Sequence, residues 1–122
     1  MLLDSNIIIS AAKPGGEALA GFLAAPDACI SVITRIESLG YHLLSGAEEK
    51  EIALFLTDLP ELALDDLIAD RAIVLRQQKK MGLADAIIAA TALLYDLPLV
   101  TRNEDDFKHI ADLHLINPSN AI

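Results

Sequence analysis

The chain begins with MLLDSNIIIS, residues 1–10, an apolar run in which Asp4 is the one charged side chain. Short apolar runs of this kind predict a core strand, which should end before the break at residues 13–16 (KPGG). A buried ionised carboxylate is costly without a partner. Asp4 therefore either caps a following turn or helix, or belongs to a site at the carboxyl end of the strand, where open α/β sheets bind ligands. This stretch alone leaves both interpretations open.

Beyond the opening run, apolar segments of strand length alternate with segments of helical periodicity. Strand patterns cover residues 28–32, 61–64, 99–101 and 114–116, and helical patterns cover residues 17–25, 33–44, 46–59, 66–80 and 84–94. Alternation with short connections predicts a parallel sheet with helices on both faces. We therefore expect a single domain over residues 1–122, with a three-layer α/β/α fold and a central, mostly parallel sheet of four or five strands.

Several details of the predicted helices are specific. Ser45 and Glu48 form a Ser-x-x-Glu capping box. Residues 84–94 (ADAIIAATALL) are apolar almost all round, which predicts a buried central helix. Helical spacing places Ile36 and Leu67 on the core-facing stripes of their helices.

The composition is strongly apolar. Apolar residues make up 53% of the chain and aromatic residues only 4%, and the mean hydropathy is +0.43. No run approaches the ~18–20 apolar residues of a membrane span, and the start lacks the basic region of a signal peptide. A lone cysteine, Cys29, excludes an internal disulfide and suits the cytoplasm. The excess apolarity predicts a surface that a second copy or another partner covers.

The net charge of −9 is the wrong sign for a protein that holds nucleic acid by charge alone. It leaves a basic partner, a metal site that concentrates acids, or a nuclease with a local basic patch. Four of the nine basic residues fall within one ten-residue segment, namely Arg71, Arg76, Lys79 and Lys80. A solvated helix face is the simpler interpretation of that segment.

Four acids stand where such a sheet could bring them together. Asp4 follows the first strand, Glu37 lies on the inward edge of a helix, Asp85 begins the buried helix, and Asp105 or Asp106 follows the strand ending at residue 101. Each also has a purely structural interpretation: Glu37 could pair with a neighbouring base, Asp85 could interact with the helix dipole, and the last acid could lie in an ordinary loop.

The four acids together predict more than each one alone. Two carboxylates ~4 Å apart repel by roughly 4 kcal/mol at an effective dielectric near 20. A cluster must therefore be protonated or hold a cation. Oxygen ligands without His or Cys favour a hard ion, Mg²⁺ or Mn²⁺.

Four segments carry a resemblance to a known family: LLDSN at 2–6, SVITRIESLGY at 31–41, GLADAIIAATAL at 82–93 and LVTRNEDDF at 99–107. They resemble the four motifs of PIN-domain ribonucleases, in the family's order and spacing. They look most like the VapC-like toxins of bacterial and archaeal toxin–antitoxin pairs. The resemblance spans nearly the whole chain and implies a PIN-like fold.

The resemblance also implies roles for individual residues. Asp4, Glu37 and Asp85 match the family's three firm metal-binding acids, and Asp106 is preferred to Asp105 as the fourth because it directly precedes Phe107. In some relatives the fourth acid stands at the position of Asn103. Supporting roles fall to Ser5, Asn6, Thr101 and Asn103, and candidates for contact with the RNA backbone are Arg102, Arg76, Lys79 and Lys80.

The implied activity is hydrolysis of RNA by a metal-activated water, with Mg²⁺ or Mn²⁺, leaving a 5′-phosphate and a 3′-hydroxyl. A homodimer silenced by a cognate antitoxin is expected, while the RNA target stays open. A phosphatase would need a second acid at position 6, which is Asn. A phosphorelay domain would need a strand-end Lys where Thr101-Arg102 stands. A PIN-fold interaction scaffold and a free-standing RNA-processing nuclease remain as alternatives.

Overall fold

The computed structural model describes residues 1–121 and contains five short parallel strands. One sheet has the order β1-β4-β5, and a second pair joins β2 to β3. The strands are β1 (Leu2–Leu3), β2 (Ile30–Ser31), β3 (Glu61–Leu62), β4 (Leu99–Val100) and β5 (Leu115–Ile116). A parallel bridge between Leu2 and Cys29 connects the two parts, so the spatial order is β3-β2-β1-β4-β5. The predicted mostly parallel sheet is confirmed.

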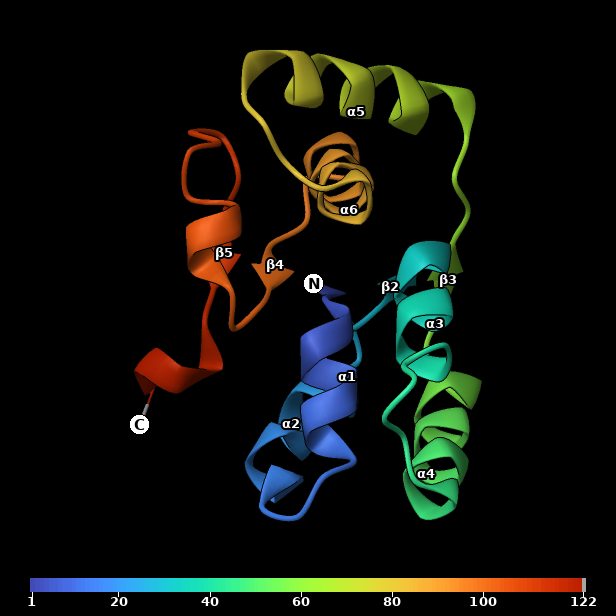
Figure 1. Ribbon diagram of the computed structural model, residues 1–122. Helices are drawn as coiled ribbons and strands as arrows, with labels where there is room; N and C mark the ends of the chain where they lie inside the picture. The colour runs from blue at the N-terminus through green and yellow to red at the C-terminus, as the bar shows by residue number, and fades with distance from the viewer. Residues whose placement is uncertain (122) are drawn as a thin grey trace.

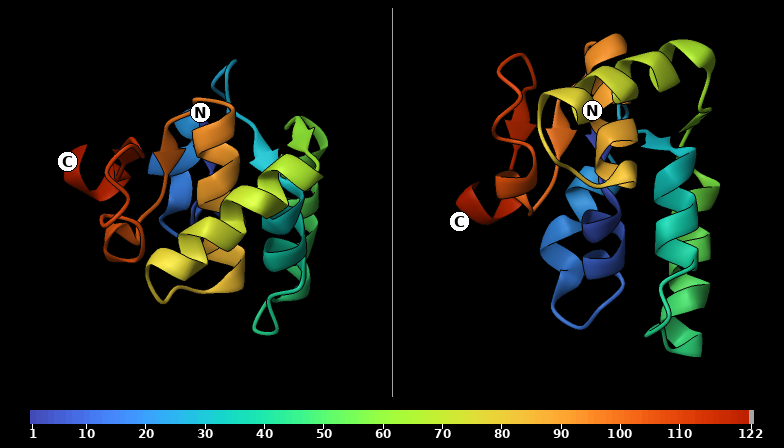
Figure 2. Two further views of the ribbon diagram at one scale, coloured as in Figure 1. Left: turned by 90° about the horizontal axis from the view of Figure 1, so that it is seen from above. Right: turned by 45° about the horizontal axis from the view of Figure 1, so that its top comes forward.

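Helices cover both faces of this sheet (Figure 1). They are α1 (Ser5–Ala11), α2 (Ala20–Leu23), α3 (Val32–Leu39), α4 (Gly46–Thr57), α5 (Asp66–Gln78) and α6 (Leu83–Leu94), with 3₁₀ turns η1 (Gly16–Leu19), η2 (Glu104–Asp106) and η3 (Pro118–Ala121). Figure 1 shows α5 and α6 on one side of the strands and α1 to α4 on the other. Seen from above in Figure 2, α5 crosses over α6.

The strand residues divide the core into two layers. Leu2 pairs with Leu99 and packs with α5 and α6, while Leu3 pairs with Val100 and packs with α1 and α4. Alternate residues of a strand point to opposite faces, so two residues per strand serve both layers. The prediction of a buried central helix is confirmed, because every residue of α6 from 86 to 92 is buried.

The opening run differs from its prediction. The strand ends at Leu3, and Asp4 turns the chain into α1 by accepting the Ser5 N–H at 2.8 Å. Ile7 and Ile8 are fully buried, as a core strand would bury them, but they lie on a helix. A helix-capping acid prevailed over the strand preference of three consecutive isoleucines.

Other predicted boundaries were partly right. The capping box of Ser45 and Glu48 is present at the start of α4. The helix expected over 33–44 stops at Leu39, because Gly40 caps it and glycine is a poor helix former. The segment expected as one helix over 17–25 is a 3₁₀ turn followed by the single turn α2.

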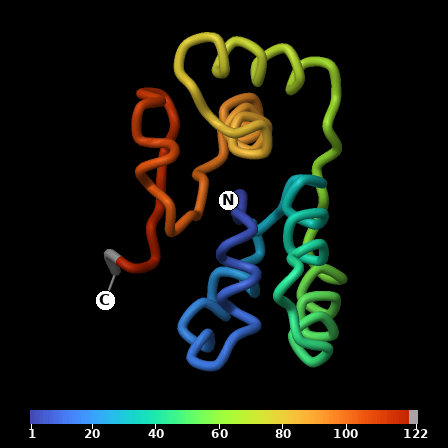
Figure 3. The backbone as a smooth tube through the Cα atoms, in the orientation of Figure 1, coloured from blue at the N-terminus to red at the C-terminus, as the bar shows by residue number. Residues whose placement is uncertain are grey.

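Two residues expected in the core are exposed instead. Ile36 is 59% exposed and Leu67 is 69% exposed. On α5 the buried positions are Ile68, Ala72 and Leu75, and Leu67 projects to one side of that stripe. The tube in Figure 3 shows the chain starting in the middle of the fold, beside β4. No helix within residues 1–121 is long and apolar enough to cross a membrane.

Candidate metal centre

The four acids lie along the carboxyl edge of the central strands. Asp4 directly follows β1, Glu37 lies on α3 immediately after β2, and Asp106 lies on η2 after β4. Asp85 is in the first turn of α6. Parallel strands bring their carboxyl ends to one edge, so residues from distant parts of the sequence meet there.

Asp4 is the most firmly held member of the group. Its side chain is buried, with 4% of the residue exposed. One carboxylate oxygen accepts the Ser5 N–H, and the other accepts the Thr101 hydroxyl at 2.9 Å and the Asn6 amide at 3.2 Å. Both interpretations of Asp4 hold at once, because the acid that caps α1 also sits at the end of β1.

Thr101 and Asn6 tie this carboxylate to the loop after β4. The Thr101 hydroxyl accepts the Asn6 amide and the Asn103 backbone N–H, each at 3.1 Å. The Asn6 side-chain oxygen accepts the Arg102 N–H at 3.2 Å. Ser5 reaches the other way and donates its hydroxyl to Glu37 at 3.1 Å. The four predicted supporting residues thus all take part in one hydrogen-bond network.

The electrostatics of these acids reflect their closeness to one another. Burial, against the hydrogen bonds from Thr101 and Ser5, raises the pKa of Asp4, and the charge of Asp106 raises that pKa further. Burial also raises the pKa of Glu37, with a smaller contribution from the charge of Asp4. The pKa of Asp85 is raised to about 6, first by burial and then by the charges of Asp4, Asp106 and Glu37.

None of these four acids has a basic partner within ion-pair distance among the described residues. Arg35, the base nearest to Glu37 in sequence, pairs with Glu61 instead. Asp105 pairs with Lys108 at 2.9 Å and is turned to solvent, whereas the charge of Asp106 acts on Asp4 and Asp85. The effect of the Asp106 charge on the pKa of Asp4 and of Asp85 therefore favours Asp106 over Asp105 as the fourth member.

The donor set fits a hard divalent cation, since it consists of carboxylates backed by hydroxyl and amide groups. Among residues 1–121, no three His, Cys, Asp or Glu side chains already stand at metal-ligand spacing. The pKa of Asp85 nevertheless reflects, after burial, the charges of the other three acids, so the four carboxylates lie close enough to interact electrostatically.

The predicted basic residues are not all brought to the acids. Arg102 lies beside them through its backbone bond to Asn6, and its guanidinium donates to Ser10 at 3.3 Å. Arg76 donates to the carbonyl of Met81, in the loop that leads into α6. Lys79 and Lys80 are exposed in that same loop region.

The sequence analysis did not identify Ser10 as a hydrogen-bond partner of Arg102. In a strand, Asn6 and Ser10 would stand ~13 Å apart, but on α1 they are neighbours at i and i+4 on one helix face. The Asp-Ser-Asn helix cap was the signal that could have revealed this.

Comparison with known proteins identifies the family of the chain. Residues 1–113 match the family model for the PIN domain. The chain belongs to the PIN domain family.

The chain is similar to several individual proteins. The chain is 31% identical over 88 residues to Ribonuclease VapC of Rickettsia bellii, a match that covers 72% of this chain and 55% of that relative's length. It is also similar to a chain of a toxin–antitoxin complex from Klebsiella pneumoniae, with 33% identity, a TM-score of 0.74 and 96% of each chain covered. A chain of DNA-bound VapBC from Salmonella typhimurium shows 27% identity and a TM-score of 0.77, again with 96% of each chain covered.

Proposed function

We propose that this protein is a metal-dependent endoribonuclease that acts as the toxin of a toxin–antitoxin pair. The observation that carries this proposal is the convergence of Asp4, Glu37, Asp85 and Asp106 on one sheet edge without a basic partner among the described residues. The likeness to Ribonuclease VapC supports the substrate class, and the likeness to chains of toxin–antitoxin complexes supports the biological role.

Asp4, Glu37 and Asp85 would hold Mg²⁺ or Mn²⁺, with Asp106 completing the set. Such a cation, when bound, activates water and offsets the charge that develops on a phosphoryl group. In the hydrolysis we propose, water attacks phosphorus in line, the bond from phosphorus to the 3′-oxygen breaks, and a 5′-phosphate and a 3′-hydroxyl result.

The remaining residues position the acids. Thr101 and Asn6 fix the Asp4 carboxylate from one side by donating to it, and Ser5 steers Glu37 from the other. Asn103 donates its backbone N–H to Thr101 and so sets the direction in which that hydroxyl donates. Because these groups are already oriented before substrate binds, substrate binding does not have to order them.

The exposed apolar surface of the protein indicates that partners bind to it. Several large apolar side chains on α3 to α6 and their connections are exposed, among them Ile36, Leu43, Leu54, Leu67, Ile73 and Leu83. A second copy and an antitoxin segment would cover this surface. Sedimentation of the purified chain should give the mass of a dimer, and addition of an antitoxin should give a stable heavier complex.

Cleavage of RNA by the purified protein tests the activity. We expect cleavage with Mg²⁺, none with EDTA, and a large loss in Asp4→Asn, because the best-held ligand is then neutral. Asp70→Asn, at an exposed position on α5, is the matched control and should cleave like the wild type. Activity unaffected by both EDTA and Asp4→Asn would contradict a metal-dependent nuclease.

A further inference from the structure

A pocket of about 430 Å³ lies between the end of α1 and the loop that follows β4. We call it the Arg102 pocket, and its polar and charged lining includes Ser10, Lys13, Arg102 and Ser119. Leu19 and Phe22 contribute an apolar wall. A volume of this order is typical of pockets that bind small ligands.

The charge of this pocket is opposite to that of the molecule. Both charged residues in its described lining, Lys13 and Arg102, are basic, and no described acid lines it. The chain as a whole carries a net charge of −9. A local positive pocket on an acidic protein attracts an anionic group. The acidic residues elsewhere on the protein repel that group little, because exposed charges more than ~10 Å away are screened by salt.

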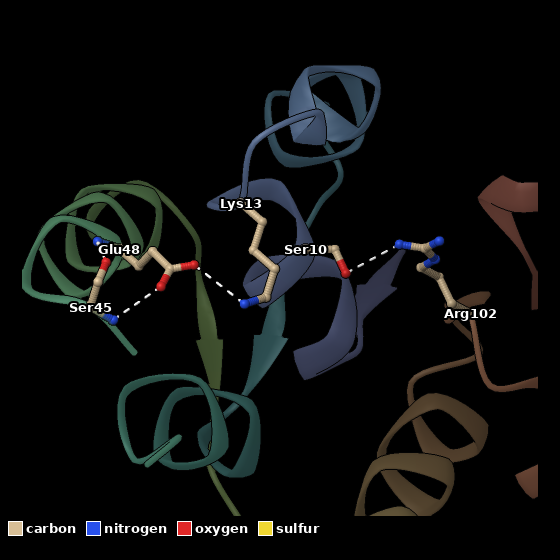
Figure 4. A network of polar contacts seen from close by, with 5 residues as sticks. All are labelled: Ser10, Lys13, Ser45, Glu48 and Arg102. Atoms are coloured by element: carbon tan, nitrogen blue, oxygen red, sulfur yellow. Dashed lines mark hydrogen bonds and ion pairs between the residues drawn. The ribbon is translucent and has the colours of Figure 1, made fainter. Parts of the chain in front are cut away.

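Arg102 is fixed at both ends. Its backbone N–H donates to Asn6, which itself donates to Asp4, so Arg102 stands two hydrogen bonds away from the candidate metal centre. Its guanidinium donates to Ser10 at 3.3 Å, as Figure 4 shows. None of the described carboxylates pairs with this guanidinium, so its other N–H groups are available for a phosphate.

Lys13 is held on the other side of the end of α1 (Figure 4). Its ammonium lies 3.3 Å from the Glu48 carboxylate, whose other oxygen accepts the Ser45 N–H. The Lys13 side chain is 44% exposed, and an exposed ion pair of this kind contributes little to stability. Lys13 can therefore exchange its partner for a phosphate at little cost.

We propose that the Arg102 pocket binds one nucleotide of a single-stranded RNA, next to the phosphodiester at the candidate metal centre. Arg102 holds its phosphate, Lys13 adds positive charge to the lining of the pocket, and the base lies against Phe22. This inference rests on the proposed ribonuclease activity. One path for an RNA strand with a phosphate at Asp4 leads past Asn6, and Arg102 is the residue bonded to Asn6 on that side. Apolar and aromatic side chains accept any base by stacking.

The test measures binding of a fluorescein-labelled single-stranded RNA in EDTA, from about 50 to 200 mM KCl. Arg102→Ala should weaken binding about tenfold, as expected for a charge-assisted hydrogen bond. It should also lower the slope of log affinity against log salt by about 0.7, the value for one phosphate contact on a single strand. Lys13→Ala should act in the same direction, and Arg102→Lys should restore most of the slope.

Arg71→Ala is the matched control. Arg71 lines a different pocket with Pro98 and His114, which precede β4 and β5 and so mark the opposite edge of the sheet. It should bind RNA like the wild type. With Mg²⁺ present, Arg102→Ala should raise KM while kcat at saturating RNA stays close to the wild-type value, because the contact serves binding.

Two results would contradict the inference without contradicting the proposed function. One is wild-type RNA affinity and salt slope in both Arg102→Ala and Lys13→Ala while RNA is still cleaved. The other is unchanged RNA binding together with weakened antitoxin binding, which would assign the pocket to the protein partner. A wild-type protein that neither binds nor cleaves RNA would overturn both proposals.

Discussion

Asp105 and Asp106 are adjacent exposed acids whose charges act on different groups, and they offer a matched pair of substitutions. Asp106→Asn should lower the rate of RNA cleavage at least about tenfold, because its charge acts at the candidate metal centre. Asp105→Asn removes only a surface ion pair with Lys108 and should leave the rate nearly unchanged. Initial rates with Mg²⁺ measure both, and equal effects would assign no special role to Asp106.

Asp85 predicts a pH dependence of stability in the absence of metal. Its pKa of about 6 in the folded chain lies above the ordinary value of 3.8, so the folded state holds the proton more tightly than the unfolded state. The protonated carboxyl therefore stabilises the fold at low pH, and this contribution is lost as the pH rises from about 4 to about 6.

Asp85→Asn should accordingly raise the melting temperature in EDTA at pH 7 and have little effect below pH 4, where the wild-type carboxyl is neutral as well. Calorimetry across this range, with Asp70→Asn as the control, measures the difference. A gain of equal size at both pH values would point to packing instead of charge.

At the scale of elements, one hydroxyl joins the end of β4 to the start of α1. Thr101 is fully buried and connects Asp4, Asn6 and Asn103. Thr101→Val keeps the shape but leaves those groups without their common partner, which should cost about 1–3 kcal/mol of unfolding free energy. Thr101→Ser keeps the hydroxyl and should cost less, about 0.8 kcal/mol for the lost methyl. Urea unfolding measures both, and equal costs would show that the hydroxyl contributes nothing.

The same junction marks the limit of what sequence patterns could predict. Alternating periodicity was enough for the parallel sheet and for the buried helix α6, because long apolar patterns leave few alternatives. Ile7 to Ile9 favour a strand by local preference, but the helix cap at Asp4 and the tertiary layer beneath β1 and β4 together outweigh that preference. The hydrogen bonds of Thr101 and Arg102 depend on contacts across more than ninety residues, which local patterns do not carry.

At the scale of the whole molecule, the chain has 18 acids and 9 bases, and under the proposed function a divalent cation bound by the clustered acids should stabilise the fold. Mg²⁺ at about 100 times its Kd should add about 2.7 kcal/mol to the unfolding free energy. The gain should disappear in Asp4→Asn and persist in Asp70→Asn. Melting curves in MgCl₂ and in KCl of equal ionic strength separate binding from screening, and equal rises in the two salts would contradict a specific site.

The position of β1 in the middle of the sheet also has a consequence for biosynthesis. Leu2 and Leu3 leave the ribosome long before Leu99 and Val100, with which they pair, and the hydroxyl that fixes Asp4 belongs to a residue 97 positions later. A nascent chain that has emerged only as far as α6 lacks β4, Thr101 and Asp106, and it therefore holds Asp4 without the hydroxyl that fixes it. Under the proposed function, the chain becomes harmful to its own cell only after β4 has been translated, which gives an antitoxin time to meet it.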